Sequence, residues 1–284
     1  MQYIIVMPAY NEAEGIGQTL ESLGQQTLLP KELVVVNDGS TDETAAIVQA
    51  FAAQHPWVRL INHQKGESRH APGGKIVRAF YVGYNTITTA YDFVVKLDAD
   101  LDLPANYFEK VSKIFTNDPK IGIAGGINVV ERDGKWVIEN FADDDHVRGA
   151  FKAYRKACFQ DIGGLKESVG WDTVDELLAI YHGWKIKTDL SLQIKHRRER
   201  GTMTGFIKVM LKIGRAMFRM RYGFLVTFFS AIKAGMVNRP FVLTGIGVLR
   251  GYFRAWLDKD SYIVSPEEGR FIRQYRWQRL GKKY

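Results

Sequence analysis

Short apolar runs alternate with helical patterns over the first 130 residues of the chain. Runs rich in β-branched residues predict buried strands. These runs are Tyr3–Met7, Leu33–Asn37, Val58–Asn62, Phe93–Leu97 and Ile121–Val130. Between them, apolar residues repeat at helical spacing, as at Ile16, Leu20 and Leu23. The β-α-β-α order predicts an α/β fold that is Rossmann-like, with a mostly parallel sheet and helices on both faces.

Local signals mark where some helices begin and end. Ser40 with Glu43, and Thr173 with Glu176, form two capping boxes. A capping box predicts a helix that starts directly after its first residue. Gly183 is a break that ends the second of these helices.

The segment 151–159 also has a helical pattern, and it contains Cys158, the single cysteine of the chain. One cysteine excludes an intramolecular disulfide, which fits a reducing compartment. We expect Cys158 to be a small buried residue rather than a nucleophile. Residues 185–194 predict one or two further strands.

Charge divides the chain unevenly, although its 284 residues suit one large domain or one domain with an appendage. Residues 1–194 hold 19 Lys and Arg against 26 Asp and Glu, whereas residues 195–284 hold 20 against 5. An acidic part followed by a strongly basic part indicates two separate roles within one chain.

Residues 203–256 have a helical pattern in which apolar and basic positions fall on different faces. Met210 and Met217 belong to the apolar set, and Lys208 and Lys212 belong to the basic set. Such helices suit the headgroup boundary of an anionic membrane, so we expect peripheral membrane association. The alternative is a helical subdomain that packs its apolar face on the rest of the protein.

No run of about 18 uncharged apolar residues is present, and the first residues lack the basic leader of a signal peptide. We therefore expect no membrane-spanning helix. A last predicted helix, at 267–280, carries four arginines at a spacing of three. Nucleic-acid binding is an alternative for such a surface, but no recognisable nucleic-acid module accompanies it, so we expect no nucleic-acid partner.

Polar residues follow three of the predicted strands. The first strand runs into residues 8–12 (Pro-Ala-Tyr-Asn-Glu), the second into 37–40 (Asn-Asp-Gly-Ser) and the fourth into 98–100 (Asp-Ala-Asp). Each segment is also typical of a turn. Ligands of parallel sheets bind beyond the carboxyl ends of the strands, however, so three polar segments at one edge predict a binding site.

Asp98 and Asp100 are two residues apart. If strand geometry continued through them, their carboxylates would point the same way, roughly 6–7 Å apart. They would repel each other without a cation between them, and a divalent metal that carries phosphate oxygens is one such cation. A polar turn is the simpler alternative for this pair taken alone.

The three polar segments, in this order and spacing, resemble the nucleotide-sugar-dependent family 2 glycosyltransferases with the GT-A fold, over roughly residues 2–200. The resemblance implies a GT-A catalytic domain in residues 1–200, followed by the basic amphipathic helical region in residues 201–284. It also implies metal-dependent transfer of a hexose from a nucleotide-diphosphate sugar donor to an acceptor hydroxyl.

The resemblance assigns roles by position. The base and ribose pocket would be lined by Pro8, Ala9, Tyr10 and Glu12. Asp38 would accept a hydrogen bond from the nucleotide base. Asp98 would contact the ribose or the metal, and Asp100 would hold Mg²⁺ or Mn²⁺ against the diphosphate.

Lys75 and His196 are further candidates. Lys75 begins a predicted helix, where family members often carry a basic residue near the donor, and a helix amino terminus also suits an anion. His196 follows a strand-like segment, where relatives often place a His that completes the metal site or touches the diphosphate. The alternatives are a solvated lysine and a structural histidine.

The catalytic base has two candidates. Many family members have Glu-Asp eleven residues before a Gly-aromatic pair, and Asp172 stands eleven residues before Gly183 and Trp184, with Trp171 in place of the Glu. Asp175 is the second candidate. Asp172 is favoured because the amino end of a helix stabilises the ionised carboxylate that a base needs.

One base with no nucleophile predicts inversion at the anomeric carbon. We expect an inverting glycosyltransferase in cell-envelope polysaccharide, lipopolysaccharide or glycolipid synthesis, with a saccharide or lipid-linked acceptor. It would be cytoplasmic and peripheral on the inner face of the cell membrane. One alternative is a sugar-nucleotide pyrophosphorylase, which would want a Gly-rich basic loop after the first strand. The other is a non-catalytic, membrane-associated protein that binds nucleotide sugars.

Overall fold

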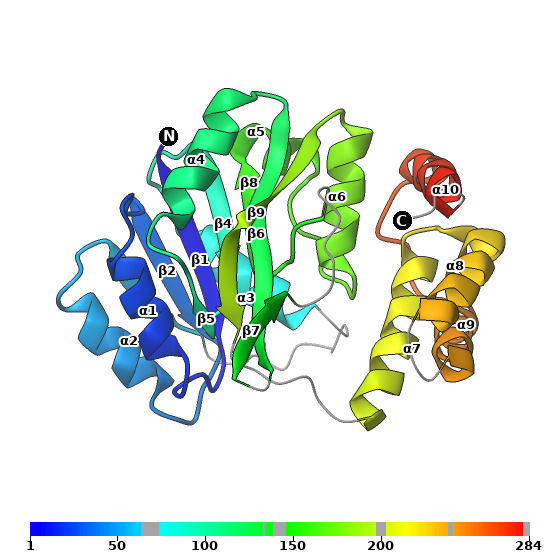
Figure 1. The fold of residues 1–284 in the computed structure, drawn as a ribbon, viewed down its shortest axis with the longest axis horizontal. Helices are drawn as coiled ribbons and strands as arrows, with labels where there is room; N and C mark the ends of the chain where they lie inside the picture. Colours follow the sequence, from blue (N-terminus) through cyan, green and yellow to red (C-terminus); the bar gives the residue numbers. More distant parts are fainter. Residues whose placement is uncertain (64–73, 133, 139–145, 197–202, 238–240, 281–284) are drawn as a thin grey trace. The chain divides into compact units, whose positions relative to one another are not determined.

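The computed structural model describes residues 1–63, 74–132, 134–138, 146–196, 203–237 and 241–280 (Figure 1). The chain divides into two compact units. Unit 1 contains Met1–His70, Lys75–Leu165 and His182–Glu199. Unit 2 contains Ala71–Gly74, Lys166–Tyr181 and Arg200–Tyr284. Unit 2 therefore includes the expected C-terminal helical region together with an earlier segment, Lys166–Tyr181, that carries both candidate bases.

Within the described residues, nine strands of unit 1 form one sheet, in the order β3-β2-β1-β4-β8-β6-β9-β5 with β7 paired to β6. The strands are β1 (Tyr3–Ala9), β2 (Glu32–Asn37), β3 (Val58–Asn62), β4 (Phe93–Leu97), β5 (Leu101–Asp102), β6 (Ile121–Arg132), β7 (Lys135–Ile138), β8 (Phe151–Arg155) and β9 (Lys185–His196). The first four strands pair in parallel. This arrangement confirms the predicted mostly parallel α/β sheet.

Helices cover both faces of the sheet (Figure 1). The helices of unit 1 are α1 (Ile16–Gly24), α2 (Thr44–Ala52), α3 (Lys75–Tyr84), α4 (Tyr107–Asn117) and α5 (Lys156–Asp161). On one face, α1 packs against α2, and the Gln26 side chain at the end of α1 accepts a hydrogen bond from the backbone of α4. On the other face, Phe80 and Tyr84 of α3 contact Phe159 of α5.

The core of unit 1 is centred on β1 and β4. The β1 residues Tyr3–Met7 are at most 1 % exposed, as are all residues of β4 except Lys96, at 2 %. The Tyr3 ring stacks on Phe93 and Phe108, with ring centroids 4.9 and 4.7 Å apart. Strands buried on both faces read as continuous apolar runs, which is why these two could be located from the sequence.

Unit 2 consists of helices α6 (Trp171–Tyr181), α7 (Met203–Arg219), α8 (Gly223–Val237), α9 (Phe241–Leu257) and α10 (Pro266–Leu280). Helix α9 packs against α7 and α8, and α10 packs against α8 and α6. None of the helices in the described residues combines the length and apolar character needed to cross a bilayer.

The prediction of a helix over 151–159 is wrong for its first half. Phe151–Arg155 forms β8, which pairs antiparallel with β4 and with β6 in the middle of the sheet. Only Lys156–Asp161 is helical. Burial of β8 between two strands outweighs a helical pattern that five residues carry only weakly. Cys158, on α5, is fully buried, as expected.

Neither predicted capping box forms. Helix α2 begins at Thr44, and the Ser40 hydroxyl instead accepts a hydrogen bond from the Asn11 backbone N–H at 3.0 Å. Helix α6 begins at Trp171, so Thr173 and Asp172 both lie within its first turn. Polar side chains near a helix start serve whichever backbone N–H lies within reach, and tertiary contacts decide which one that is.

Candidate nucleotide and metal site

The loops after β1 and β2 are joined by hydrogen bonds. Asn11, at φ 53°, donates its backbone N–H to the Ser40 hydroxyl, and its side-chain Oδ1 accepts from the Thr41 N–H at 2.8 Å. The Glu12 N–H donates to the Thr44 hydroxyl at 2.8 Å. Asn tolerates the left-handed backbone conformation better than most residues. Asn11 therefore fixes the two motif segments against each other.

Asp38 occupies a turn that its neighbours hold in place. Its N–H donates to the Ala9 carbonyl at 2.9 Å, which connects the ends of β1 and β2. The Asn37 Oδ1 accepts from the Ser40 N–H at 3.0 Å, and Gly39 provides the positive φ of 74° that the turn requires. The Asp38 side chain is thereby presented at the carboxyl edge of the sheet.

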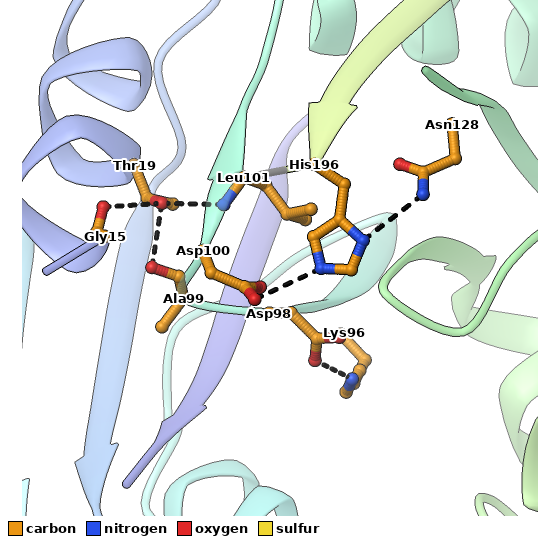
Figure 2. Close-up of polar contacts among 9 residues, drawn as sticks. All are labelled: Gly15, Thr19, Lys96, Asp98, Ala99, Asp100, Leu101, Asn128 and His196. Atoms are coloured by element: carbon orange, nitrogen blue, oxygen red, sulfur yellow. Dashed lines mark hydrogen bonds and ion pairs between the residues drawn. The ribbon is translucent and has the colours of Figure 1, made fainter. Parts of the chain in front are cut away.

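The Asp98–Asp100 turn is held from behind by Thr19, a fully buried residue of α1 (Figure 2). The Thr19 hydroxyl donates to the Ala99 carbonyl at 2.8 Å and accepts from the Leu101 N–H at 2.9 Å. One hydroxyl thus satisfies a buried donor and a buried acceptor on either side of Asp100. These two hydrogen bonds therefore hold the Asp98–Asp100 turn in place.

His196 lies beside Asp100, with Nε2 at 3.1 Å from Oδ2 (Figure 2). The short strand β5 pairs with the end of β9 so that Leu101 is opposite His196, which brings the two side chains together. On the other side of the ring, the Asn128 amide lies 3.3 Å from Nδ1. When Asn128 donates to Nδ1, Nε2 carries the proton that Asp100 accepts.

Asp98 is paired with Lys96, whose side chain is only 2 % exposed (Figure 2). Burial raises the pKa of the Asp98 carboxyl, and the charge of Lys96 acts in the opposite direction. Lys152, on the neighbouring strand β8, is opposite Lys96 and is also buried. A second buried basic residue therefore lies beside Lys96 in the sheet.

A cavity of about 380 Å³ opens at this edge of the sheet. Its lining includes all nine residues that the sequence assigned to nucleotide and metal binding: Pro8, Ala9, Tyr10, Glu12, Asp38, Lys75, Asp98, Asp100 and His196. The expected convergence of the ends of β1, β2 and β4 is therefore present. A cavity of this size lies within the range of small-ligand sites.

The described residues contain no group of three or more His, Cys, Asp and Glu side chains arranged to hold a metal ion. Asp100 and His196 offer two adjacent donors, a carboxylate oxygen and an imidazole nitrogen. Magnesium and manganese sites in nucleotide enzymes commonly use one or two protein carboxylates and take further oxygens from phosphate and water. The donor set fits such an ion when a diphosphate completes it.

The two candidate bases lie on α6, in unit 2. Asp172 is partly exposed in the first turn. Asp175 is only 1 % exposed, and its Oδ1 accepts from the Glu176 N–H at 2.6 Å. An acceptor hydroxyl must reach the base, and the Asp172 side chain is more exposed than that of Asp175.

Sequence reasoning missed Thr19, Lys96 and Asn128. Thr19 and Asn128 lie in apolar surroundings of a helix and a strand, and nothing local marks either one. Lys96 left a usable signal, because a lysine inside the apolar run of β4 needs a buried anionic partner. Asp98, two residues further on and on the same side of an extended chain, is that partner.

Three characterised relatives share parts of this sequence. Chondroitin synthase from Escherichia coli is 40 % identical over 81 residues, which are 28 % of this chain and 12 % of the relative. Dolichyl-phosphate beta-glucosyltransferase ALG5C from Trichomonas vaginalis is 31 % identical over 116 residues, 38 % of this chain and 32 % of the relative. Poly-beta-1,6-N-acetyl-D-glucosamine synthase from Staphylococcus aureus is 28 % identical over 123 residues, 43 % of this chain and 27 % of the relative. The chain thus matches less than a third of the length of each.

Two solved structures share the fold over nearly the whole chain. The mannosyltransferase PcManGT from Pyrobaculum calidifontis, in complex with GDP-Man and Mn²⁺, superposes with a TM-score of 0.56 at 19 % identity, covering 99 % of this chain and 81 % of its own. S. aureus TarS 1–349 in complex with UDP gives a TM-score of 0.56 at 17 % identity, covering 100 % of this chain and 93 % of the TarS chain. These likenesses show the GT-A fold.

The site and the fold agree with one family. The family model described as Glycosyl transferase family 2 matches residues 4–160. That range contains the ends of β1, β2 and β4 and most of the cavity residues. The chain belongs to glycosyl transferase family 2.

Proposed function

We propose that the protein is an inverting glycosyltransferase that moves a hexose from a nucleotide-diphosphate sugar to an acceptor hydroxyl. The observation that carries the proposal is one cavity in which the nine predicted nucleotide and metal residues, from five separate segments, meet. Family membership and the sugar-transferring relatives support it. The pathway we propose is cell-envelope polysaccharide, lipopolysaccharide or glycolipid synthesis.

The cavity residues divide into groups that suit different parts of a donor. Asp38 offers a carboxylate to the N–H groups of a nucleotide base, and Tyr10, at 47 % exposed, offers an aromatic face. Pro8, Ala9 and Glu12 complete the base and ribose pocket. Asp98 is assigned to the ribose. Lys75, at the amino end of α3, is assigned to the diphosphate, where a cation and unpaired backbone N–H groups both favour an anion.

Asp100 and His196 would hold Mg²⁺ or Mn²⁺. Glu12 and Asp38 add negative charge to the same cavity, so a balancing divalent cation favours the entry of a diphosphate. Asn128 carries a donor and an acceptor, so it can hold His196 Nδ1 in either tautomer. A bound divalent ion supplies charge that stabilises the departing diphosphate. The Mn²⁺ in the PcManGT structure supports this assignment.

Asp172 is assigned as the base, with Asp175 as the alternative. The acceptor oxygen attacks the anomeric carbon from the face opposite the diphosphate while its proton passes to the Asp172 carboxylate. The bond between the anomeric carbon and the diphosphate oxygen breaks, and the nucleoside diphosphate leaves. One displacement with one base inverts the anomeric configuration. Lys75 adds positive charge near the leaving group.

Membrane association and the acceptor class belong to the same proposal. The basic, apolar helices of unit 2 support a peripheral protein on the inner face of the cell membrane. The acceptor is assigned as a saccharide or a lipid-linked saccharide, and no nucleic-acid partner is assigned. The pyrophosphorylase alternative is disfavoured because residues 8–12 give β1 no Gly-rich basic loop.

Ligand-induced stabilisation tests the donor site directly. The melting temperature is measured with UDP, GDP, CDP and dTDP sugars, each with and without Mn²⁺. We expect one nucleotide class to raise it, since a ligand that binds the folded state stabilises it by mass action. Asp38→Asn should remove this effect. If no nucleotide stabilises the wild-type protein under any of these conditions, the donor assignment is wrong.

Transfer assays test the base. Asp172→Asn should keep nucleotide binding and lose transfer by about 10²–10⁴-fold, whereas Asp175→Asn should retain most of it. The reverse result would move the base to Asp175. Retained anomeric configuration in the product would overturn the inverting mechanism. Donor binding without transfer over a broad acceptor panel would favour the non-catalytic alternative.

A further inference from the structure

Helices α7, α8 and α9 of unit 2 leave many of their large apolar side chains exposed, although others, such as Phe218 and Val248, are buried. On α8 and α9, five apolar side chains are more than 60 % exposed: Leu225, Met236, Val242, Trp256 and Leu257. We call this surface the α8–α9 apolar face. Several large apolar side chains exposed on neighbouring helices mark an interaction site.

The same helices place small residues where they touch each other. At Gly214 of α7, an added Cβ would lie 1.9 Å from the Val248 carbonyl oxygen of α9, and at Gly251 it would lie 2.1 Å from the Leu211 carbonyl oxygen. The two backbones are therefore in direct contact. Close packing through small residues, with large apolar residues outside, is the arrangement that helices adopt in lipid.

A groove of about 500 Å³ runs between α8 and α9. Its described lining is apolar throughout, and includes Ile232, Met236, Val242, Ile246 and Leu249. Several of these residues also belong to the apolar face or adjoin it in the sequence, so the groove and the face form one continuous apolar surface. A hydrocarbon chain matches such a lining because it has no polar group to leave unsatisfied.

The charge of this segment identifies the partner. Residues 203–257 contain nine Lys and Arg and no Asp or Glu. Lys208, Lys212 and Arg250 are exposed on α7 and α9. A second copy of the chain would bring the same cations against one another, whereas an anionic bilayer supplies the opposite charge next to an apolar layer.

We propose that the α8–α9 apolar face enters the acyl layer of an anionic bilayer, and that the groove between these helices receives a hydrocarbon chain of a bilayer lipid. This inference deepens the membrane association in the proposed function and rests on it. Helices of 15 and 17 residues with basic neighbours lie in the plane of the interface. The aromatic ring of Trp256 would enter the lipid with them.

Ring contacts through α10 link α8 to the helix that carries the candidate bases. Within unit 2, Phe229 of α8 contacts Trp277 of α10, with ring centroids 5.6 Å apart. Phe271 of α10 contacts Tyr181 of α6 at 5.4 Å. Docking through α8 and α9 therefore holds α6 close to the membrane, which suits an acceptor that is itself anchored in the bilayer.

Vesicle binding of the full chain tests the proposal. Wild-type protein should sediment with phosphatidylcholine–phosphatidylglycerol vesicles, and less with phosphatidylcholine alone or at high salt. The double variant L225D/L257D should bind the anionic vesicles about tenfold more weakly or worse, since it places charges where two exposed leucines would enter the acyl layer. Leu190→Asp is the matched control, because Leu190 is a 52 % exposed leucine of β9 in unit 1, and it should bind as the wild type does.

Depth is tested with phosphatidylglycerol vesicles that contain brominated acyl chains, which quench tryptophan fluorescence inside the acyl layer. We expect strong quenching in the wild type and little in the conservative variant Trp256→Phe. Equal vesicle binding by L225D/L257D and the wild type would overturn the proposal. Equal quenching in the wild type and Trp256→Phe would overturn it as well.

Two further readouts separate the alternatives. A wild-type dimer in the absence of vesicles that L225D/L257D converts to a monomer would mean that a second copy covers the face, and would overturn the lipid assignment. Nucleotide-induced stabilisation in L225D/L257D should equal that of the wild type, which also shows that the variant is folded. Lost vesicle binding with intact nucleotide binding supports the inference, whereas vesicle binding without nucleotide binding would remove the proposed donor site alone.

Discussion

His196 Nε2 lies 3.1 Å from Asp100 Oδ2, although 96 positions separate the two residues in the chain. The contact exists because the two-residue strand β5 follows the acidic turn directly and pairs with the very end of β9. The pairing of β5 with β9 therefore brings the Asp100 carboxylate next to the His196 imidazole, although His196 belongs to none of the three polar segments.

Replacing this histidine should weaken metal-dependent nucleotide binding. For His196→Ala we expect the Mn²⁺ concentration that gives half-maximal nucleotide stabilisation to rise by at least about tenfold, because one of two adjacent donors is lost. A Mn²⁺ titration of the melting temperature at fixed nucleotide measures it. His182→Ala, an exposed histidine elsewhere in unit 1, should leave the titration unchanged. An unchanged titration in His196→Ala would exclude His196 from the metal site.

The Thr19 hydroxyl should stabilise both the fold and the acidic turn. Thr19→Val keeps the shape of the side chain but leaves the Ala99 carbonyl and the Leu101 N–H without their buried partner. We expect a loss of about 1–3 kcal/mol in the free energy of unfolding, together with weaker donor binding. Urea denaturation and nucleotide titration measure the two effects. Thr19→Ser retains the hydroxyl and should recover most of both; a Val variant as stable as the wild type would contradict the assigned role.

Asp42 gives the motif loops a pH-dependent contribution to stability. Hydrogen bonding from the Thr44 hydroxyl, at 2.5 Å, lowers the pKa of Asp42 below its usual value of 3.8, and the backbone N–H groups of Ala13 and Thr44 add to this effect. Because the pKa is lower in the folded state, the carboxylate stabilises the fold above the unfolded pKa. This contribution is lost as the pH falls through the folded pKa.

We therefore expect Asp42→Asn to be less stable than the wild type at neutral pH, because an amide offers one acceptor oxygen where the carboxylate offers two. The difference should shrink as the pH falls below about 4. Urea denaturation at several pH values measures this dependence. Glu43→Gln changes the neighbouring exposed carboxylate and is the control. A stability difference for Asp42→Asn that does not vary with pH would contradict the prediction.

The contact between α7 and α9 should not tolerate a side chain at Gly214. Gly214→Ala would place a methyl group 1.9 Å from the Val248 carbonyl oxygen, so the helices must separate. We expect a loss of about 1–3 kcal/mol in the free energy of unfolding, measured by chemical denaturation. Gly205→Ala, on the same helix, is the control, because a Cβ at this position meets no described atom within 4 Å. It should be neutral or stabilising by up to about 1 kcal/mol.

Much of the cavity lining could be predicted because many of its residues directly follow apolar strands. Asp38 and Asp100 could be placed at one edge of the sheet because the ends of parallel strands meet there. Thr19 could not, since a threonine inside an amphipathic helix has the same local pattern whether it faces a carbonyl or packs in the core. The first capping box failed because a distant backbone N–H took the Ser40 hydroxyl, and the second failed because α6 begins two residues before Thr173.

The amino-acid sequence was sufficient to define the alternation of strands and helices from β1 to β4, the basic helical region near the C-terminal end, and the acidic turn after β4. These features depend on periodicity and turn chemistry over a few residues, and such patterns can be recognised from neighbouring residues alone. Folding in three dimensions settled the insertion of β8 between β4 and β6, the pairing of His196 with Asp100 and the position of Lys152 opposite Lys96. Each of these depends on which distant segment packs alongside, and the register of such pairs is set by burial across the whole sheet rather than by neighbours in the chain.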